Sequence, residues 1–318
     1  DRAIAIEPDR VRLMALGEQG EWFAEMTAAL HDLRPPRATA APAAQLTVRD
    51  DRDSYLKMIA RAQELIIRGE SYEICLTTQL RAEVEMDPLA AYLALRAANP
   101  TSYGSFLQLG EMAVLSSSPE RFITIDASGR VESKPIKGTR PRGRNPQEDA
   151  ALIADLTDNP KDRAENLMIV DLVRNDLARG AQPATVQVEK LFDVETYATV
   201  HQLVSTITAQ LGGKDPIDCV RVAFPGGSMT GAPKIRTMEI IDELETGPRG
   251  VYSGGLGYFS LDGAVDLSMV IRTVVYTPGV LEYGVGGAIL ALSDPAAEWE
   301  EIRVKSRPLL GLLGVEFP

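Results

Sequence analysis

The sequence predicts an α+β fold built on large antiparallel sheets. Segments rich in β-branched and aromatic residues follow one another in runs, joined by short turns such as Asp262-Gly263 and Pro278-Gly279. The regular alternation of strand and helix that builds a parallel sheet is missing, and no repeat of fixed period is visible. At 318 residues, with 45% hydrophobic and 25% charged residues, the chain has the composition of a globular protein.

The N-terminal part is expected to be separate from the rest. Residues 3–6 form a strand-like stretch, and apolar residues recur at helical spacing over 19–33, which predicts a helix. Residues 34–45 are rich in Pro and Ala and lack an apolar period, as is typical of a linker. Residues 46–318 are expected to form one body.

The main body is expected to contain both strands and helices. An amphipathic helix is predicted over 53–68, with Gly69 as its stop signal. Strands are predicted at 72–80, 113–117, 121–125, 257–261, 267–276 and 280–283. Further helices are predicted at 88–98, 147–156, 162–178 and 295–306.

Charge and composition favour a small-molecule ligand. A formal net charge of −12 repels nucleic acid and anionic lipid, and no apolar run approaches the roughly 18 residues of a membrane-spanning helix. The chain has two histidines, so any metal is expected to be held by oxygen ligands. Cys75 and Cys219 stand in apolar surroundings, which predicts buried thiols and a reducing, cytoplasmic location.

Two glycine-rich segments invite comparison with nucleotide-binding motifs. Residues 226–231 have the glycine spacing of a phosphate loop, but Ala232-Pro233-Lys234 follows where that motif requires Gly-Lys-Ser/Thr. Residues 284–287 lack the third glycine of a dinucleotide fingerprint. The interpretations left open are backbone N–H groups close to an anion and a pair of tight turns.

Two pairs of carboxylates are candidate metal ligands. Asp162 and Glu165 lie three apart at a helix start and share one face, and Glu298 and Glu301 repeat the arrangement. Two such faces meeting around one ion suit Mg²⁺. The alternative, favoured when these residues are taken alone, is that acidic side chains simply stabilise the N-terminal turn of a helix.

Lys137 and Glu120 are candidate catalytic groups. A lysine amine becomes nucleophilic when its pKa falls, and burial or the nearby cations Arg140 and Arg142 would lower it. The alternative is a solvated basic loop. Glu120 is either an acid/base group or the ion-pair partner of Arg121.

Six segments, in order along the chain, resemble the chorismate-utilising enzymes, the family of anthranilate, aminodeoxychorismate, isochorismate and salicylate synthases. They lie at 117–122, 135–143, 164–176, 200–205, 224–234 and 252–258. This resemblance implies two large, mainly antiparallel sheets with helices outside and the active site between them. Lys137, in Pro135-Ile-Lys-Gly-Thr139, and the segment 71–79 are similar to the aminodeoxychorismate branch, because anthranilate synthases usually have Ala at the lysine position.

The function implied by the resemblance is amination of chorismate at C4 with ammonia to give 4-amino-4-deoxychorismate, on a route to p-aminobenzoate and folate or to a related antibiotic precursor. Lys137 is expected to form a covalent adduct at C2 while Glu120 protonates the departing hydroxyl. The implied metal is Mg²⁺, held by Glu165 and Glu301, with Asp162 and Glu298 acting through water. The implied substrate-binding residues are Arg272, Lys305, Gly286, Gly287, Tyr258, His201, Ser228, Gly138 and Thr139.

The expected partner supplies ammonia. Neither cysteine stands in the setting of a glutaminase nucleophile, so ammonia is expected from a glutamine amidotransferase subunit or fused domain. Relatives carry a longer N-terminal segment, of which residues 1–33 resemble a remnant, and the chain starts without Met, as a piece of a longer polypeptide does. The alternative functions are anthranilate synthase component I, isochorismate or salicylate synthase, and an inactive scaffold for a glutaminase partner.

Overall fold

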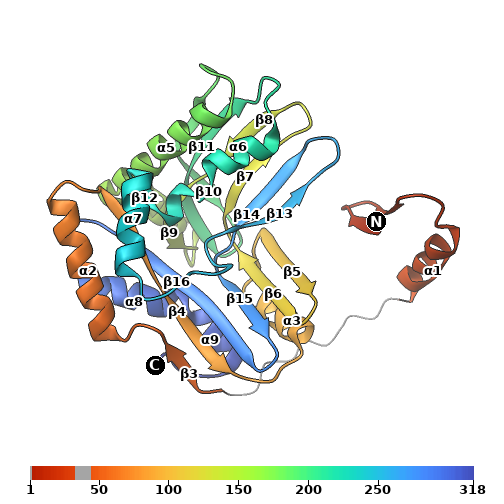
Figure 1. Cartoon of the computed structure of the whole chain (residues 1–318), viewed down its shortest axis with the longest axis horizontal. Coiled ribbons are helices and arrows are strands. Elements are labelled where there is room, and N and C mark those ends of the chain that lie inside the picture. Colours follow the sequence, from red (N-terminus) through yellow and green to blue (C-terminus); the bar gives the residue numbers. More distant parts are fainter. Residues whose placement is uncertain (1, 33–43) are drawn as a thin grey trace. The chain divides into compact units, whose positions relative to one another are not determined.

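The computed structural model describes residues 2–32 and 44–318 and divides the chain into two compact units, Asp1–Ala38 and Thr39–Pro318 (Figure 1). In the first unit an antiparallel hairpin precedes a helix; its elements are β1 (Arg2–Ile6), β2 (Val11–Ala15) and α1 (Gly20–His31). The strand and helix predicted here are confirmed. The end of that helix prediction and most of the predicted linker lie outside the described residues, and the domain division stays a prediction.

The larger unit contains two seven-stranded sheets whose recorded pairings are all antiparallel. The first sheet has the order β12 (Gly231–Ala232), β4 (Glu73–Glu83), β16 (Val280–Ile289), β15 (Thr273–Thr277), β6 (Met112–Ser118) and β5 (Tyr103–Leu109), and β3 (Leu46–Val48) pairs with β4. The second has the order β10 (Gln187–Thr196), β11 (Val200–Gln210), β8 (Arg130–Ser133), β7 (Arg121–Ile125), β14 (Val265–Met269) and β13 (Gly255–Phe259), and β9 (Ile136–Pro141) pairs with β11. The predicted α+β class with two antiparallel sheets is confirmed.

Helices cover the two sheets, and most begin with the same local signal. They are α2 (Arg52–Ile67), α3 (Pro88–Ala98), α4 (Pro146–Asp158), α5 (Pro160–Gly180), α6 (Pro216–Ala223), α7 (Lys234–Leu244), α8 (Pro295–Lys305) and α9 (Arg307–Leu313), with a 3₁₀ turn at Gly227–Met229. An Asp or Asn side chain followed by proline caps α3, α4, α5, α6 and α8, because the carboxylate or amide oxygen accepts a free backbone N–H and proline needs none.

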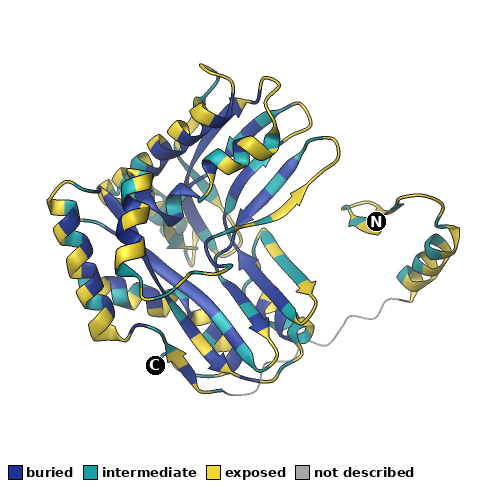
Figure 2. Cartoon of the chain, in the orientation of Figure 1, coloured by how far each residue is buried: buried dark blue, intermediate teal, exposed yellow. Residues whose placement is uncertain are grey.

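Strand β4 lies between two hydrophobic cores. Ile74 and Leu76 belong to the core under α2, α3, α8 and α9, whereas Cys75, on the opposite face, belongs to the core of the second sheet and α5. Figure 2 shows the resulting burial along the sheets and exposure on the outer helix surfaces. Glu73 shares the face of Cys75, so its carboxylate points toward the second sheet.

One predicted strand, 267–276, is in fact two. Leu267 pairs with β7 and β13 in the second sheet, whereas Thr273 pairs with Ser116 of β6 in the first. The chain crosses between the sheets at residues 270–272, where Arg272 has a φ of 52°. A left-handed residue breaks a strand, and a continuous run of β-formers gives no sign of it.

The glycine-rich segment 284–287 is strand rather than turn. β16 continues through it to Ile289, six residues beyond the predicted end, and pairs with β4 along its length. Glycine is required because a Cβ on Gly284 would lie 2.1 Å from Cγ of Tyr252. The other segment does turn tightly: a Cβ on Gly227 would lie 2.2 Å from Cδ2 of Leu172.

Replacing Gly284 by alanine is expected to lower the free energy of unfolding by about 1–3 kcal/mol, because the added methyl group overlaps the buried Tyr252 ring. Urea denaturation measures the change. Gly311→Ala is the matched control: nothing lies within 4 Å of a Cβ there, and the site is helical, so that variant is expected to be neutral or stabilised by about 0.5–1 kcal/mol. Equal stability of the two variants would contradict the packing.

Candidate active site

The centre of the candidate site is an ion pair between the two sheets. Lys137 on β9 donates from Nζ to Glu73 Oε1 on β4 at 2.8 Å. The two side chains are 12% and 1% exposed, so the pair is largely withdrawn from water. A buried lysine bound to one carboxylate is not the solvated basic loop that was the alternative for this segment.

Of the two predicted causes of a reactive Lys137, burial is present, but the neighbouring cations are not where they were expected. Arg140 and Arg142 do not face its amine; they bind aspartates, Arg140 pairing with Asp155 and Asp162 and Arg142 with Asp149. Burial acts to lower the pKa of Lys137, but the carboxylates of Glu73 and Glu165 outweigh it and raise the pKa above its usual value. In this state Lys137 is an ammonium ion, and its proton must be removed before it can act as a nucleophile.

Glu120 stands where the chain passes from β6 to β7, at the boundary of the two sheets. It is buried, and Ser228 Oγ donates to its Oε1 at 3.1 Å. Burial raises the pKa of Glu120 to about 7, although the Ser228 hydrogen bond and the charges of Lys137 and Lys305 act to lower it. Arg121 pairs with Asp266 instead. Glu120 is therefore free to hold and transfer a proton near neutral pH.

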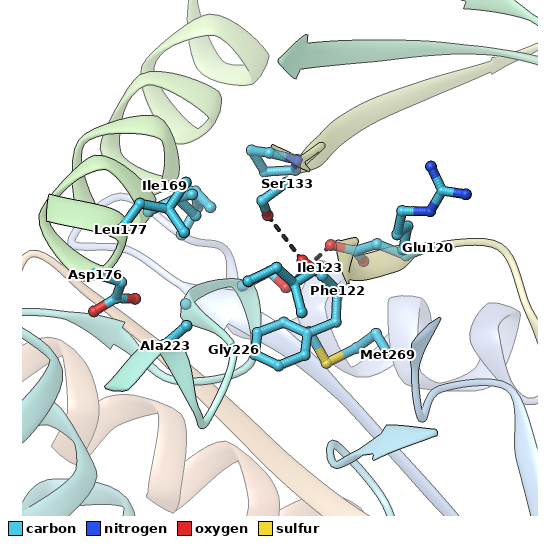
Figure 3. A pocket seen from close by; sticks show the side chains of 15 residues that line it. Glu120, Phe122, Ile123, Ser133, Ile169, Asp176, Leu177, Ala223, Gly226 and Met269 are labelled. Carbon is cyan, nitrogen blue, oxygen red and sulfur yellow. Dashed lines mark hydrogen bonds between the residues drawn. The ribbon is translucent and has the colours of Figure 1, made fainter. Parts of the chain in front are cut away.

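A small cavity of about 20 Å³ adjoins Glu120 and Ser228 (Figure 3). It lies between β7, α5 and the loop at 226–228, and Figure 3 shows Ile169 and Leu177 of α5 facing Ile123 and Phe122. Lys137 and the predicted carboxylate-binding cations are absent from its lining. Of the candidate catalytic groups, the cavity therefore adjoins Glu120, and much of its lining is apolar.

Lys305 connects the cationic part of the site to the first sheet. Its Nζ lies 2.5 Å from Glu301 Oε1 and donates to the carbonyl of Gly286 at 2.8 Å. Arg272 Nη1 donates to the backbone carbonyl of Lys305 at 3.2 Å. Arg272 and Lys305 thus lie together beside β16, and their role in binding a substrate carboxylate stays a prediction. The left-handed backbone at Arg272 is the strain that functional positions often carry.

The predicted metal ligands gather around Lys161. The positive charge of Lys161 lowers the pKa of Glu165, Glu298 and Glu301, so its ammonium group lies within electrostatic range of all three. The net pKa of Glu165 and of Glu298 is nevertheless raised, mainly by burial. Lys161 Nζ lies 3.8 Å from Glu165 Oε1, and carboxylate oxygens from α5 and α8 are the kind of ligand that Mg²⁺ uses.

These carboxylates do not form a closed cluster of ligands. Within the described part of the chain, no three Asp, Glu, His or Cys side chains are close enough to bind one ion together. A Cβ on Gly287 would lie 3.3 Å from Glu298 Oε2 and 3.5 Å from Glu301 Oε1, so the glycine leaves open space in front of both. Asp162 binds Arg140 and packs against Gly138. One or two direct carboxylates with further contacts through water is the usual pattern for Mg²⁺, and the residues fit it.

Two predicted pocket residues lie elsewhere. His201 is fully buried between Thr196 Oγ1 and Asp149 Oδ1, each 2.8 Å from a ring nitrogen, on the face of β11 toward α4. Its neighbour Gln202 occupies the other face and pairs with Thr139 of β9. The prediction for His201 is therefore wrong by one residue in strand register.

Tyr258 also stands apart from the predicted pocket. It is 60% exposed on β13, the strand at the edge of its sheet. Tyr252 is buried instead: burial raises its pKa, and the charge of Arg272 acts to lower it. Tyr252 and Tyr258 belong to the same matching segment, so the motif alone does not show which of them is buried and which is exposed.

Glu73 is the functional residue that the sequence analysis missed. It is the one charged residue in the predicted strand 72–80. A charge in a strand that is otherwise apolar or neutral was the signal that could have identified it, because such a charge is buried only when it is paired.

An acid, a lysine and paired carboxylates thus come together where the two antiparallel sheets meet. The family model of chorismate binding enzymes matches residues 10–311, and the chain belongs to this family. The fold agrees with this: the structure of anthranilate synthase component I from Streptococcus pneumoniae TIGR4 superimposes with a TM-score of 0.81 at 29% identity, covering 94% of this chain and 70% of that one.

Curated relatives carry a more specific name. Aminodeoxychorismate synthase of Streptomyces griseus is 62% identical over 284 residues, which is 89% of this chain and 39% of that protein. Aminodeoxychorismate synthase component 1 of Escherichia coli (strain K12) is 46% identical over 251 residues, 79% of this chain and 55% of that protein. The chain thus spans less than two thirds of the length of either relative.

Proposed function

We propose that this chain catalyses the amination of chorismate at C4 to give 4-amino-4-deoxychorismate. The observation that carries the proposal is a buried lysine, Lys137, within electrostatic range of an acid, Glu120, whose pKa of about 7 suits proton transfer. The names of the curated relatives support the same reaction. A scaffold without activity would have no need for a buried lysine and a proton donor held in this arrangement.

The proposed reaction has two displacements. Neutral Lys137 Nζ attacks C2 of the ring, the C4–O bond breaks, and Glu120 donates its proton to the departing hydroxyl, which leaves as water. Ammonia then attacks C4, the C2–N bond breaks, and Glu120 takes a proton from the new C4 ammonium group. Dividing one difficult substitution into two easier ones is the purpose of covalent catalysis.

Substrate binding is assigned to the cations beside β16. Arg272 and Lys305 supply the positive charge that a dicarboxylate needs in a chain of net charge −12. Glu165 and Glu301 would hold Mg²⁺, which supplies charge neutralisation and orientation of a substrate carboxylate. Glu298, which Ser293 Oγ binds at 2.7 Å, and Asp162 would support it through water.

Ammonia is proposed to come from a glutamine amidotransferase subunit or fused domain. The Escherichia coli relative is named as component 1, and the match covers 39% of the Streptomyces griseus protein. No helix among the described residues is both long and apolar enough to cross a membrane. A cytoplasmic location stays a prediction.

The test is incubation of the chain with chorismate, Mg²⁺ and an ammonium salt, with the products identified by mass spectrometry. Aminodeoxychorismate is the expected product. Anthranilate as the product would instead identify the chain as an anthranilate synthase component, like its Streptococcus pneumoniae neighbour. Isochorismate or salicylate would identify it as an isochorismate or salicylate synthase. Unchanged chorismate, in protein that melts cooperatively, would favour a scaffold.

Replacing Ser228 by alanine is expected to move the pH dependence of kcat/KM upward. Glu120 must be protonated to donate, so activity is expected to fall as pH rises through about 7. The Ser228 hydrogen bond lowers the pKa of Glu120, and its loss shifts this fall to higher pH. Initial rates between pH 5 and 9 measure it, with Ser128→Ala, an exposed serine in another turn, as control. A fall at unchanged or lower pH would refute the assignment.

A further inference from the structure

Glu73 is a buried carboxylate in which one of the two oxygens has no hydrogen-bond partner among the described residues. Oε1 accepts from Lys137, and the oxygen without a partner among those residues is the buried Oε2. A charged oxygen left without a partner costs more than a neutral one, and few buried groups in folded proteins are in this state. A sheet strand could place a neutral residue here at lower cost, so the carboxylate calls for a chemical explanation.

The proposed reaction needs a group that removes a proton from Lys137. The titratable and charged groups within electrostatic reach of Lys137 come from four elements: Glu73 and Cys75 on β4, Glu165 on α5, Glu301 on α8 and Glu120 between β6 and β7. Among the described residues, Glu73 is the carboxylate within 4 Å of Nζ. Glu120 is bound to Ser228 and already carries the proton that the leaving hydroxyl requires.

We propose that Glu73 is the base that accepts the proton of Lys137 and so generates the nucleophilic amine. This rests on the proposed function. The proton moves from Nζ to Oε1, the N–H bond breaks, the O–H bond forms, and an ion pair becomes a neutral amine beside a neutral carboxylic acid. When ammonia has displaced Lys137 from C2, the acid returns the proton to the amine, and the pair is restored.

Burial makes this transfer feasible. The pair has no net charge before or after the proton moves, so the transfer places no new charge in the interior. Desolvation of the two charges opposes their attraction and so narrows the difference between the ion pair and its neutral form. The unpartnered Oε2 adds to this effect, since an oxygen of a neutral acid loses less without a partner than a carboxylate oxygen does. The carboxylates of Glu73 and Glu165 still keep the pKa of Lys137 raised, so the ion pair is the resting state.

The decisive experiment compares Glu73→Gln with the wild type as a function of pH. Glutamine has nearly the same shape but cannot accept the proton, so kcat/KM is expected to fall by about 10²–10⁴-fold at neutral pH. The variant must then rely on deprotonation by solvent. The ratio of the kcat/KM of the variant to that of the wild type is expected to rise about tenfold per pH unit between pH 5 and 7. The ionisation of Glu120 and of ammonium affects both proteins equally and therefore cancels in this ratio.

Two further variants separate proton transfer from support of the fold. Glu73→Asp keeps the base and is expected to recover part of the loss, with a pH-independent ratio to the wild type. Glu70→Gln removes a carboxylate from a more exposed ion pair, with Arg236, in the same segment and is expected to behave as the wild type. A Glu73→Gln variant with wild-type activity, or with a constant deficit at every pH, would overturn the proposal.

A readout without turnover makes the result independent of the proposed function. Acetic anhydride labels neutral amines, and peptide mass spectrometry follows Lys137 across pH. Glu73 holds the proton on Lys137, so Glu73→Gln is expected to shift labelling of Lys137 to lower pH and to leave Lys134 unchanged. If the wild type forms no aminodeoxychorismate, the function fails while a labelling shift still supports proton exchange within the pair. An unshifted labelling midpoint would reject the role of Glu73 in either case.

Discussion

Lys137→Ala is expected to lower the rate of aminodeoxychorismate formation by at least about 10³-fold, because the covalent route ends without its amine. The variant also leaves Glu73 as a buried charge without a partner, which by itself costs about 3–5 kcal/mol of stability. Lys137→Gln is therefore the second variant, since its amide can donate to Glu73 without acting as a nucleophile. Product formation by mass spectrometry, together with a thermal melt of each variant, measures the effect.

The control for this experiment is Lys134→Ala. Lys134 lies three residues away, on the same segment, and pairs with Glu195 rather than with a site residue. It is expected to retain most of its activity. Retention of activity in Lys137→Gln, with the correct product, would mean that ammonia displaces the hydroxyl directly and that Lys137 only binds substrate.

Glu165→Gln is expected to raise the Mg²⁺ concentration needed for half-maximal activity by at least about 100-fold. Supporting residues around bound metals are commonly worth 10–100-fold, and a direct ligand is expected to be worth at least as much. Glu165 is 12% exposed and burial raises its pKa, so a divalent ion at this carboxylate would stabilise its charged form. Titration of activity with Mg²⁺ after treatment with a chelator gives the shift.

Asp171→Asn is the matched control on the same helix. Asp171 lies on the exposed face of α5 and pairs with Arg174, so its loss is expected to leave the Mg²⁺ dependence unchanged. If Glu165→Gln responds to Mg²⁺ as the wild type does, the ion is held elsewhere. Activity that persists in full after chelation would remove the metal from the proposal.

The sequence predicted those parts of the site that depend on local spacing. Glu298 and Glu301 share a face because they lie three apart on a helix, and the capped start of α8 is visible in its Asp-Pro pair. Most helices and several strands followed from the same short-range signals. Segments 187–210 and 234–244 were left unassigned, although β10, β11 and α7 occupy them.

Contacts between residues far apart in the sequence could not be predicted from these short-range signals. Nothing within a few residues of Lys137 reveals that Glu73, sixty-four positions earlier, binds its amine. The error at His201 has the same origin: a shift of one residue in a strand exchanges the two faces of the sheet, and the strand partner decides which face meets the substrate. A third long-range feature that the sequence does not reveal is the change of sheet at Arg272, which falls inside a continuous run of β-formers.

The Glu73–Lys137 pair joins a strand of one sheet to a strand of the other, and Glu120 occupies the connection between them. Neither sheet alone contains all the groups of the site. Catalytic activity therefore requires that both sheets have formed and packed together. Contacts between segments far apart in sequence are slow to form because the intervening chain must first be ordered. During refolding, each sheet can be complete while the protein is still inert, and the appearance of activity then marks the moment at which the two halves meet.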